Sequence, residues 1–262
     1  MDLDLNGKVA LVAASSKGLG KAIAKGLAKE GADVVICARD AETLTRTQQE
    51  IEQTGREVLA VPADLTDYSQ VQDLVLKAIT AFGKIDILVT NCGGPPSGSF
   101  LDFSIEDWRK AIDLNLMSTI YLCREVLPHL RSQGQGRIIM ITSVAVKQPI
   151  DGLILSNTVR AGVTGLAKSL ANEFGQENIL VNSVLPGYTY TDRVEELAKT
   201  LADKQGVQSE EIVQGWARQI VTGRLATPDE IANVVLFLAS EKASYLTGVA
   251  LQVDGGHAKG LL

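Results

Sequence analysis

The feature that most constrains the fold is an alternation of short apolar runs with longer segments of helical spacing. Runs rich in Val and Ile predict strands at residues 8–14, 32–38, 57–63, 85–91, 136–143, 179–186 and 249–254. Most of these runs are apolar at consecutive positions, which is typical of strands buried on both faces of a parallel sheet. The segments between them predict helices at residues 18–30, 41–54, 67–82, 104–131, 155–175 and 228–240.

This alternation predicts βαβ units with right-handed crossovers, and therefore a doubly wound α/β fold of Rossmann type. No linker or change of composition divides residues 1–262, so we expect a single domain. The segment 189–226, between the sixth and seventh predicted strands, departs from the strand–helix alternation because it is polar and helical over a long stretch. It is either a surface helix pair or a lid, and we favour a lid because ligands bind beyond the carboxyl ends of such strands.

Charge and composition exclude several classes of function. The net charge is −6 and no run of Lys or Arg forms a basic stripe, so neither nucleic acid nor an anionic membrane is an expected partner. No secretory signal and no apolar run long enough to cross a bilayer is expected, which favours a cytoplasmic protein. Cys37, Cys92 and Cys123 lack metal-ligand spacing, so we expect reduced thiols and no metal site.

A glycine-rich loop follows the first predicted strand. In AASSKGLG, residues 13–20, Gly18 and Gly20 open a helix directly after that strand. Glycine lets the backbone approach a pyrophosphate closely, and the helix N-terminus supplies unpaired N–H groups. The loop therefore predicts a dinucleotide site.

Further motifs follow in an order that resembles the short-chain dehydrogenase/reductase superfamily. Thr90-Asn91-Cys92-Gly93 is similar to its NNAG motif, Asp64 to its adenine-contacting Asp, and Pro186-Gly187 to its PG motif. The segment from GRLATPDE to QVDGG resembles β-ketoacyl-acyl-carrier-protein reductases, and the resemblance covers nearly the whole chain. It implies a seven-stranded parallel sheet in the order 3-2-1-4-5-6-7 with helices on both faces, a nicotinamide dinucleotide, and a homotetramer or dimer.

The resemblance also implies a set of cofactor-binding residues. They are Ala14, Ser15, Ser16, Lys17, Gly18, Leu19, Gly20, Arg39, Asp64, Leu65, Asn91, Gly93, Arg160, Pro186 and Gly187. Ala13 and Ala14 stand where the family has Thr and Gly, and Ala lacks the conformational freedom of Gly. We therefore expect a slightly different turn at Ala14.

The end of the second predicted strand bears on the choice of dinucleotide. A carboxylate there would bind the ribose hydroxyls of NAD and repel a 2′-phosphate. The chain has Arg39 at this point and Lys17 in the glycine-rich loop, and both cations could face a 2′-phosphate. Asp40 could oppose that phosphate or could be a helix N-cap. We favour NADP(H) over NAD(H).

The catalytic residues implied by the resemblance are Ser143, which would hold the substrate oxygen, and Asn115, which would support a water chain. The family's Tyr and Lys fall at positions occupied by Ser156 and Arg160, and AGVTGLAKSLA keeps the helix in register. Arg160 keeps the positive charge and can donate to ribose hydroxyls. Ser156 is shorter and less acidic than a phenol and could at best position a water, whereas general acid catalysis contributes roughly 10²–10⁴-fold.

Two functions therefore remain open. The first is an NADP(H)-dependent oxidoreductase, similar to 3-oxoacyl reductases, that acts on a small carbonyl or alcohol with an atypical active site. The second is a catalytically weak or inactive dinucleotide-binding protein that serves as a sensor or partner subunit.

A replacement for the missing acid, or a substrate contact, could come from Lys147, Tyr188 or Tyr190. Each has a simpler explanation: Tyr188 as an aromatic wall, Tyr190 on the lid, and Lys147 in solvent. Trp216 is expected to be an apolar wall of the substrate site, and His129 and His257 to be surface or interface residues. One further set, expected to be mostly core, lies at helical spacing along 104–131: Trp108, Ile112, Leu116, Ile120 and Leu127.

Overall fold

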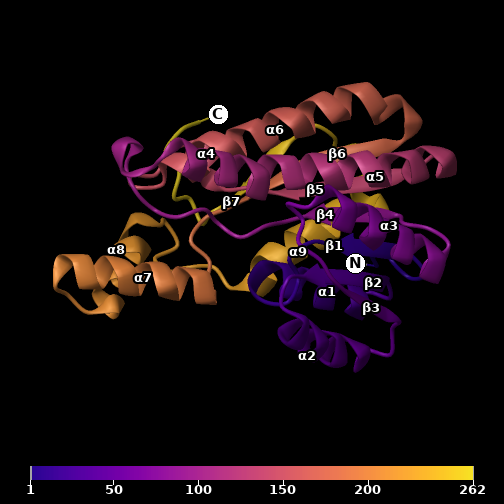
Figure 1. The fold of residues 1–262 in the computed structure, drawn as a ribbon, viewed down its shortest axis with the longest axis horizontal. Helices are drawn as coiled ribbons and strands as arrows, with labels where there is room; N and C mark the ends of the chain where they lie inside the picture. Colours follow the sequence, from indigo (N-terminus) through magenta and orange to yellow (C-terminus); the bar gives the residue numbers. More distant parts are fainter. Residues whose placement is uncertain (1, 262) are drawn as a thin grey trace.

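The computed structural model describes residues 2–261, and within them the strands form one parallel sheet (Figure 1). Its order is β3-β2-β1-β4-β5-β6-β7, which confirms the predicted topology. The strands are β1 Val9–Val12, β2 Asp33–Ala38, β3 Val58–Pro62, β4 Ile87–Thr90, β5 Gly136–Ile141, β6 Ile179–Pro186 and β7 Ala250–Val253. Every residue of β1, β4, β5 and β6 is buried, as expected for strands covered on both faces.

Helices cover both faces of this sheet (Figure 1). They are α1 Gly18–Lys29, α2 Ala41–Glu52, α3 Tyr68–Phe82, α4 Ile105–Ile112, α5 Ser118–Gln133, α6 Ile154–Phe174, α7 Asp192–Gln205, α8 Ser209–Gln219 and α9 Pro228–Ala239. One hydrophobic cluster joins α3, α5 and α6 to the sheet, and another joins α1, α2 and α9 to its opposite face. The fold is therefore the predicted single-domain, doubly wound Rossmann arrangement.

Local signals in the sequence explain several helix ends. Thr227 caps α9 in a reciprocal capping box with Glu230, and Ser104 caps α4 in the same way with Asp107. Gly31, at the end of α1, has a φ of 96°, a left-handed conformation that glycine adopts without steric cost.

The helix expected at 104–131 is present, from Ile105 to Gln133, but it is not α-helical throughout. A π-helical segment, Asp113–Met117, separates α4 from α5. A wider turn shifts the phase of the residues on either side, so the predicted apolar stripe is not one buried face. Ile112 is 38% exposed and only Leu127 of that stripe is buried, while α5 faces the core with Leu122, Cys123, Val126 and Leu130.

The segment 189–226, called the lid segment below, folds into α7 and α8. These two helices enclose a separate small cluster centred on Ala198, Trp216, Ile220 and Leu225. A bridge between Thr189 and Ala226 joins the two ends of the segment. In Figure 1 it stands to one side of the sheet, next to the carboxyl end of β6.

No helix within residues 2–261 is both long and apolar enough to cross a membrane.

Candidate active site

A cavity of about 550 Å³ lies at the carboxyl edge of the sheet and is bordered by the first residues of the lid segment. Most of the expected site residues line it: Ala14, Ser16, Lys17, Gly18, Leu19, Arg39, Asp64, Leu65, Asn91, Gly93, Ser143, Ser156, Arg160, Pro186, Gly187 and Tyr188. The other expected residues, all in the described chain, are not among its lining residues: Ser15, Gly20, Asn115, Lys147, Tyr190 and Trp216. The fold thus gathers residues between positions 14 and 188 into one site.

The glycine-rich loop between β1 and α1 forms one wall of this cavity. Ala14 has a φ of 48°, so it adopts the left-handed conformation despite its side chain. A Cβ on Gly20 would lie 2.3 Å from the Ala14 carbonyl oxygen, so only glycine fits there. Ser15 is buried and its Oγ donates to the Val12 carbonyl (2.7 Å), which makes it a structural residue of the turn.

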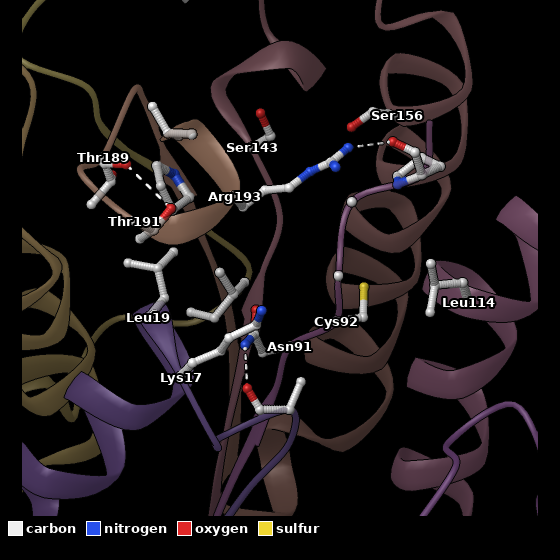
Figure 2. Close-up of a pocket in the computed structure, with 18 of the residues that line it drawn as sticks. Lys17, Leu19, Asn91, Cys92, Leu114, Ser143, Ser156, Thr189, Thr191 and Arg193 are labelled. Carbon is white, nitrogen blue, oxygen red and sulfur yellow. Dashed lines mark hydrogen bonds between the residues drawn. The ribbon is translucent and has the colours of Figure 1, made fainter. Parts of the chain in front are cut away.

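Asn91 ties the end of β4 to this loop. Its side-chain Nδ2 donates to the Ala14 carbonyl at 3.3 Å (Figure 2) and to that of Ala13 at 3.4 Å. These bonds hold the carbonyl groups of the turn, so the Asn91 amide supports the left-handed conformation at Ala14.

The end of β2 carries Arg39 and Asp40, which both line the cavity together with Lys17. The Asp40 Oδ1 accepts from the Thr43 N–H (2.7 Å) and Oγ1 (2.6 Å) and so caps α2. These hydrogen bonds from Thr43 hold the pKa of Asp40 below its usual value. The carboxylate is thus committed to the helix cap, while both neighbouring cations are exposed.

Ser156 and Arg160 are joined in the opposite part of the cavity. The buried Arg160 donates from Nε to the Ser156 Oγ (3.1 Å) and from Nη1 to the Thr142 carbonyl (3.0 Å). Since a guanidinium only donates, the Ser156 hydroxyl must direct its own proton elsewhere. Ser143 has the same property, because its Oγ accepts from the Ala145 N–H at 3.1 Å. Figure 2 shows the two serines in the same part of the cavity.

Asn115 is located behind Cys92, on the π-helical segment. It is buried, its Oδ1 accepts from the Cys92 Sγ at 3.1 Å, and its Nδ2 donates to the Ala111 carbonyl at 3.3 Å. Cys92 itself lines the cavity. Burial raises the pKa of the Cys92 thiol, and the charge of Arg160 only partly opposes this effect. The thiol is therefore neutral at pH 7.

The lid side of the cavity has an aromatic wall. Tyr188 lines the cavity and stacks on Trp216, with ring centroids 4.8 Å apart and planes at 9°. Trp216 therefore supports this wall from behind. Burial raises the pKa of the Tyr188 phenol. Tyr190 and Lys147 are exposed, and neither lines the cavity.

His257 differs from the expectation of a surface or interface position. It is only 6% exposed and meets the edge of Tyr188, with ring centroids 5.4 Å apart. The chain turns there through Gly255 and Gly256, whose φ values are 62° and 82°. These glycines let the C-terminal segment fold back beneath the aromatic wall.

Sequence reasoning missed Arg193. It lies near the start of α7, lines the cavity, and donates from Nη2 to the Pro95 carbonyl at 3.0 Å (Figure 2). One signal was available, because a cation in the first turn of a helix opposes the helix dipole. Arg193 therefore does not stabilise the start of α7 through the helix dipole, which points to a role of its side chain in the cavity.

Comparisons with known proteins find relatives that match nearly the whole chain. A family model described as enoyl-(acyl carrier protein) reductase matches residues 13–258. The 3-oxoacyl-[acyl-carrier-protein] reductase FabG of Aquifex aeolicus is 37% identical, over 98% of this chain and 99% of the relative. The structure of L-sorbose reductase from Gluconobacter frateurii, complexed with NADPH and L-sorbose, matches with a TM-score of 0.95 and 35% identity over 100% of both chains. A 7α-hydroxysteroid dehydrogenase complexed with NADH matches with a TM-score of 0.89 and 33% identity, over 100% of this chain and 98% of the other.

Proposed function

The chain belongs to the short-chain dehydrogenase/reductase superfamily, and on that premise we propose that it is an NADP(H)-dependent oxidoreductase that interconverts a carbonyl and an alcohol on a small molecule. The cofactor fits the residues present, because Gly20 allows the start of α1 to approach the Ala14 turn as a pyrophosphate site requires. When bound, the nicotinamide supplies or accepts the hydride.

The observation that carries this proposal is the pair of hydroxyl groups on Ser143 and Ser156. Each Oγ already accepts a hydrogen bond from a fixed N–H group, so each proton is free to point into the cavity. A carbonyl oxygen gains negative charge when hydride reaches its carbon, and preorganised donors stabilise that charge. The two serines therefore act together as an oxyanion site.

We place Ser156 and Arg160 where the family has its Tyr and Lys. Neither a serine hydroxyl nor a single water is acidic enough to act as a strong general acid, so Ser156 donates to the developing alkoxide and positions a water whose lost proton is replaced from solvent. Arg160 orients the Ser156 hydroxyl through its Nε–H group. Its Nη2 has no hydrogen-bond partner within residues 2–261, so this nitrogen is available to donate to the cofactor ribose.

Lys17 and Arg39 support the preference for NADP(H). Both cations are exposed and line the cavity. The nearby carboxylate of Asp40 caps the N-terminus of α2. Related proteins bind either dinucleotide, so the preference must come from these residues of this chain. We expect Arg39→Ala to weaken NADP⁺ binding by roughly 10-fold or more, as for the loss of a charge-assisted hydrogen bond, and to leave NAD⁺ binding unchanged. Calorimetry measures both, with Arg46→Ala on the exposed face of α2 as the control.

A homotetramer or dimer is also part of the proposal. The half-buried side chains of Trp108 on α4, Leu116 on the π-helical segment and Ile120 on α5 form an incompletely covered apolar face, which supports self-association. A cytoplasmic location is supported by the free thiols of Cys37, Cys92 and Cys123.

The second candidate is a dinucleotide-binding protein without turnover. It is favoured by one observation: among the described residues, the only tyrosine that lines the cavity is Tyr188, whose raised pKa makes its phenol a poorer acid near pH 7.

NADPH oxidation over a panel of ketones, sugars and 3-oxoacyl thioesters separates the two functions. We expect oxidation with at least one substrate, and Ser143→Ala to lower kcat by about 10²-fold without changing the Kd for NADPH. Ser169→Ala, on the exposed face of α6, is the control. If calorimetry shows NADPH binding but no panel member is reduced, the second function is correct.

A further inference from the structure

One cation of the cavity has no part in the mechanism above. Lys17 and Arg39 flank the expected 2′-phosphate position and Arg160 holds Ser156, but Arg193 reaches the cavity from the lid segment. Figure 2 shows its side chain on the side of Ser143 and Ser156, away from Lys17.

The hydrogen bonds of Arg193 leave most of its donors available. Its Nη2 donates to the Pro95 carbonyl at 3.0 Å, which is a neutral acceptor. Within residues 2–261, Arg193 forms an ion pair with Glu196 alone, and the Nη1–Oε2 distance of 4.0 Å is at the limit for such a pair. The Arg193 side chain remains 48% exposed. Asp192 lines the cavity beside it, but no ion pair between these two side chains is recorded in the described chain. The positive charge is thus not neutralised at close range.

The surroundings of Arg193 favour pairing with an anion. Leu114, Leu153, Val194 and Leu197 supply apolar walls to the same cavity. The Arg193 side chain is 48% exposed without a ligand, and a charge pair there strengthens as a bound ligand displaces water from it. A guanidinium also presents parallel N–H groups that match the two oxygens of a carboxylate.

We propose that Arg193 binds a carboxylate group of the substrate, so that the enzyme acts on oxo acids and the corresponding hydroxy acids. This inference rests on the proposed function. The carboxylate displaces the Pro95 carbonyl from the guanidinium, and the substrate's carbonyl carbon then lies in the part of the cavity that holds Ser143 and Ser156. Arg193 is thus a specificity-determining residue, and its attachment to α7 couples substrate binding to the position of the lid segment.

The test compares 2-, 3- and 4-oxo acids with their methyl esters at saturating NADPH. We expect the wild-type protein to have a kcat/KM at least 10-fold higher for one or more acids than for the matching ester. Arg193→Gln should lower kcat/KM for the acid by roughly 10- to 100-fold, leave the ester within about twofold, and leave the Kd for NADPH unchanged. Arg193→Lys should retain part of the preference, and Arg218→Gln, an exposed cation on α8, is the control.

Other outcomes overturn the proposal. An equal loss for acid and ester would show that Arg193 only tethers the lid segment to Pro95. A weaker Kd for NADPH in Arg193→Gln would assign the residue to the cofactor. A wild-type protein that reduces ketones without preferring any acid would leave the proposed function standing and remove this inference.

A binding measurement keeps the inference testable if no substrate turns over. The protein loaded with NADP⁺ is titrated by calorimetry with 3-hydroxybutanoate, the other hydroxy acids of the panel, and their methyl esters. Binding of an acid but not its ester, lost in Arg193→Gln, supports the carboxylate site even if the proposed function fails. Absence of binding by every acid, or binding that Arg193→Gln leaves intact, contradicts it.

Discussion

Ser156 and Arg160 lie one helical turn apart on α6, which brings the Arg160 Nε within 3.1 Å of the Ser156 Oγ. Arginine keeps this geometry because its guanidinium also reaches the Thr142 carbonyl at the end of β5. The pair therefore links the helix to the sheet and orients one hydroxyl toward the cavity. The resemblance could predict which residues stand at these positions, but not that they would contact each other.

Ala14 gives a prediction about stability at the same scale. Its φ of 48° costs an L-residue roughly 1–2 kcal/mol, whereas glycine adopts it freely. Glycine also gains entropy in the unfolded chain, which offsets about half of this benefit. We expect Ala14→Gly to raise the free energy of unfolding by about 0.5 kcal/mol in urea denaturation. Ala22→Gly, within α1, should instead lower it by about 1 kcal/mol. A loss of stability in both variants contradicts the strain at Ala14.

The π-helical segment Asp113–Met117 shows the limit of sequence periodicity at the scale of elements. Its composition is ordinary for a helix, so nothing in the spacing of apolar residues marks the wider turn. Side chains stabilise it locally: the Ser118 Oγ donates to the Leu114 carbonyl (2.7 Å) and the Thr119 Oγ1 to the Asn115 carbonyl (2.8 Å). By contrast, the capping boxes of α4 and α9 each consist of two residues three positions apart, so a local sequence pattern is enough to predict them.

The start of α9 gives a prediction about pH dependence. Glu230 accepts from both terminal nitrogens of Arg224 (2.8 and 2.6 Å) and from the Thr227 N–H (2.8 Å), and these contacts, those from Arg224 above all, lower the pKa of Glu230 to about 2. A lowered pKa means that the ionised carboxylate stabilises the folded state. This contribution is complete above pH 4.5, the ordinary pKa of a glutamate side chain, and is lost as the pH falls toward 2.

We therefore expect Glu230→Gln to have a lower denaturation midpoint than the wild-type protein at pH 7. The difference should shrink between pH 4.5 and pH 2, as the wild-type carboxylate becomes protonated. Urea denaturation at several pH values measures it, with Glu57→Gln at an exposed position as the control. A difference that stays constant across this range would show that the cap does not depend on the charge of Glu230.

At the scale of the whole molecule, the parallel sheet explains why distant residues meet. Strands buried on both faces predicted the sheet, and their carboxyl ends predicted where the site would be. The contacts of Arg193 with Pro95 and of His257 with Tyr188 were not predictable. They depend on how the lid segment and the C-terminal chain cross the sheet edge, which local sequence patterns do not determine.

The lid segment should respond to the cofactor as one unit. Its hydrophobic cluster is separate from the two clusters of the sheet, and backbone bonds at Tyr188, Tyr190 and Ala226 join its ends. We expect NADPH to slow amide hydrogen exchange across 189–226, because the bound cofactor restrains the start of α7. Mass spectrometry measures this effect, and α3, which does not line the cavity, is the internal control. Unchanged exchange in α7 and α8 would contradict a lid.

The most direct test of the account is the kinetics of Ser156→Ala, because the central claim is that a serine hydroxyl takes part in holding the substrate oxygen. We expect the variant to bind NADPH with a Kd within about twofold of the wild-type value, since Arg160 remains. Its kcat for carbonyl reduction should fall by roughly 10²–10³-fold, as for the loss of one oxyanion donor. A variant that turns over at the wild-type rate would contradict the claim.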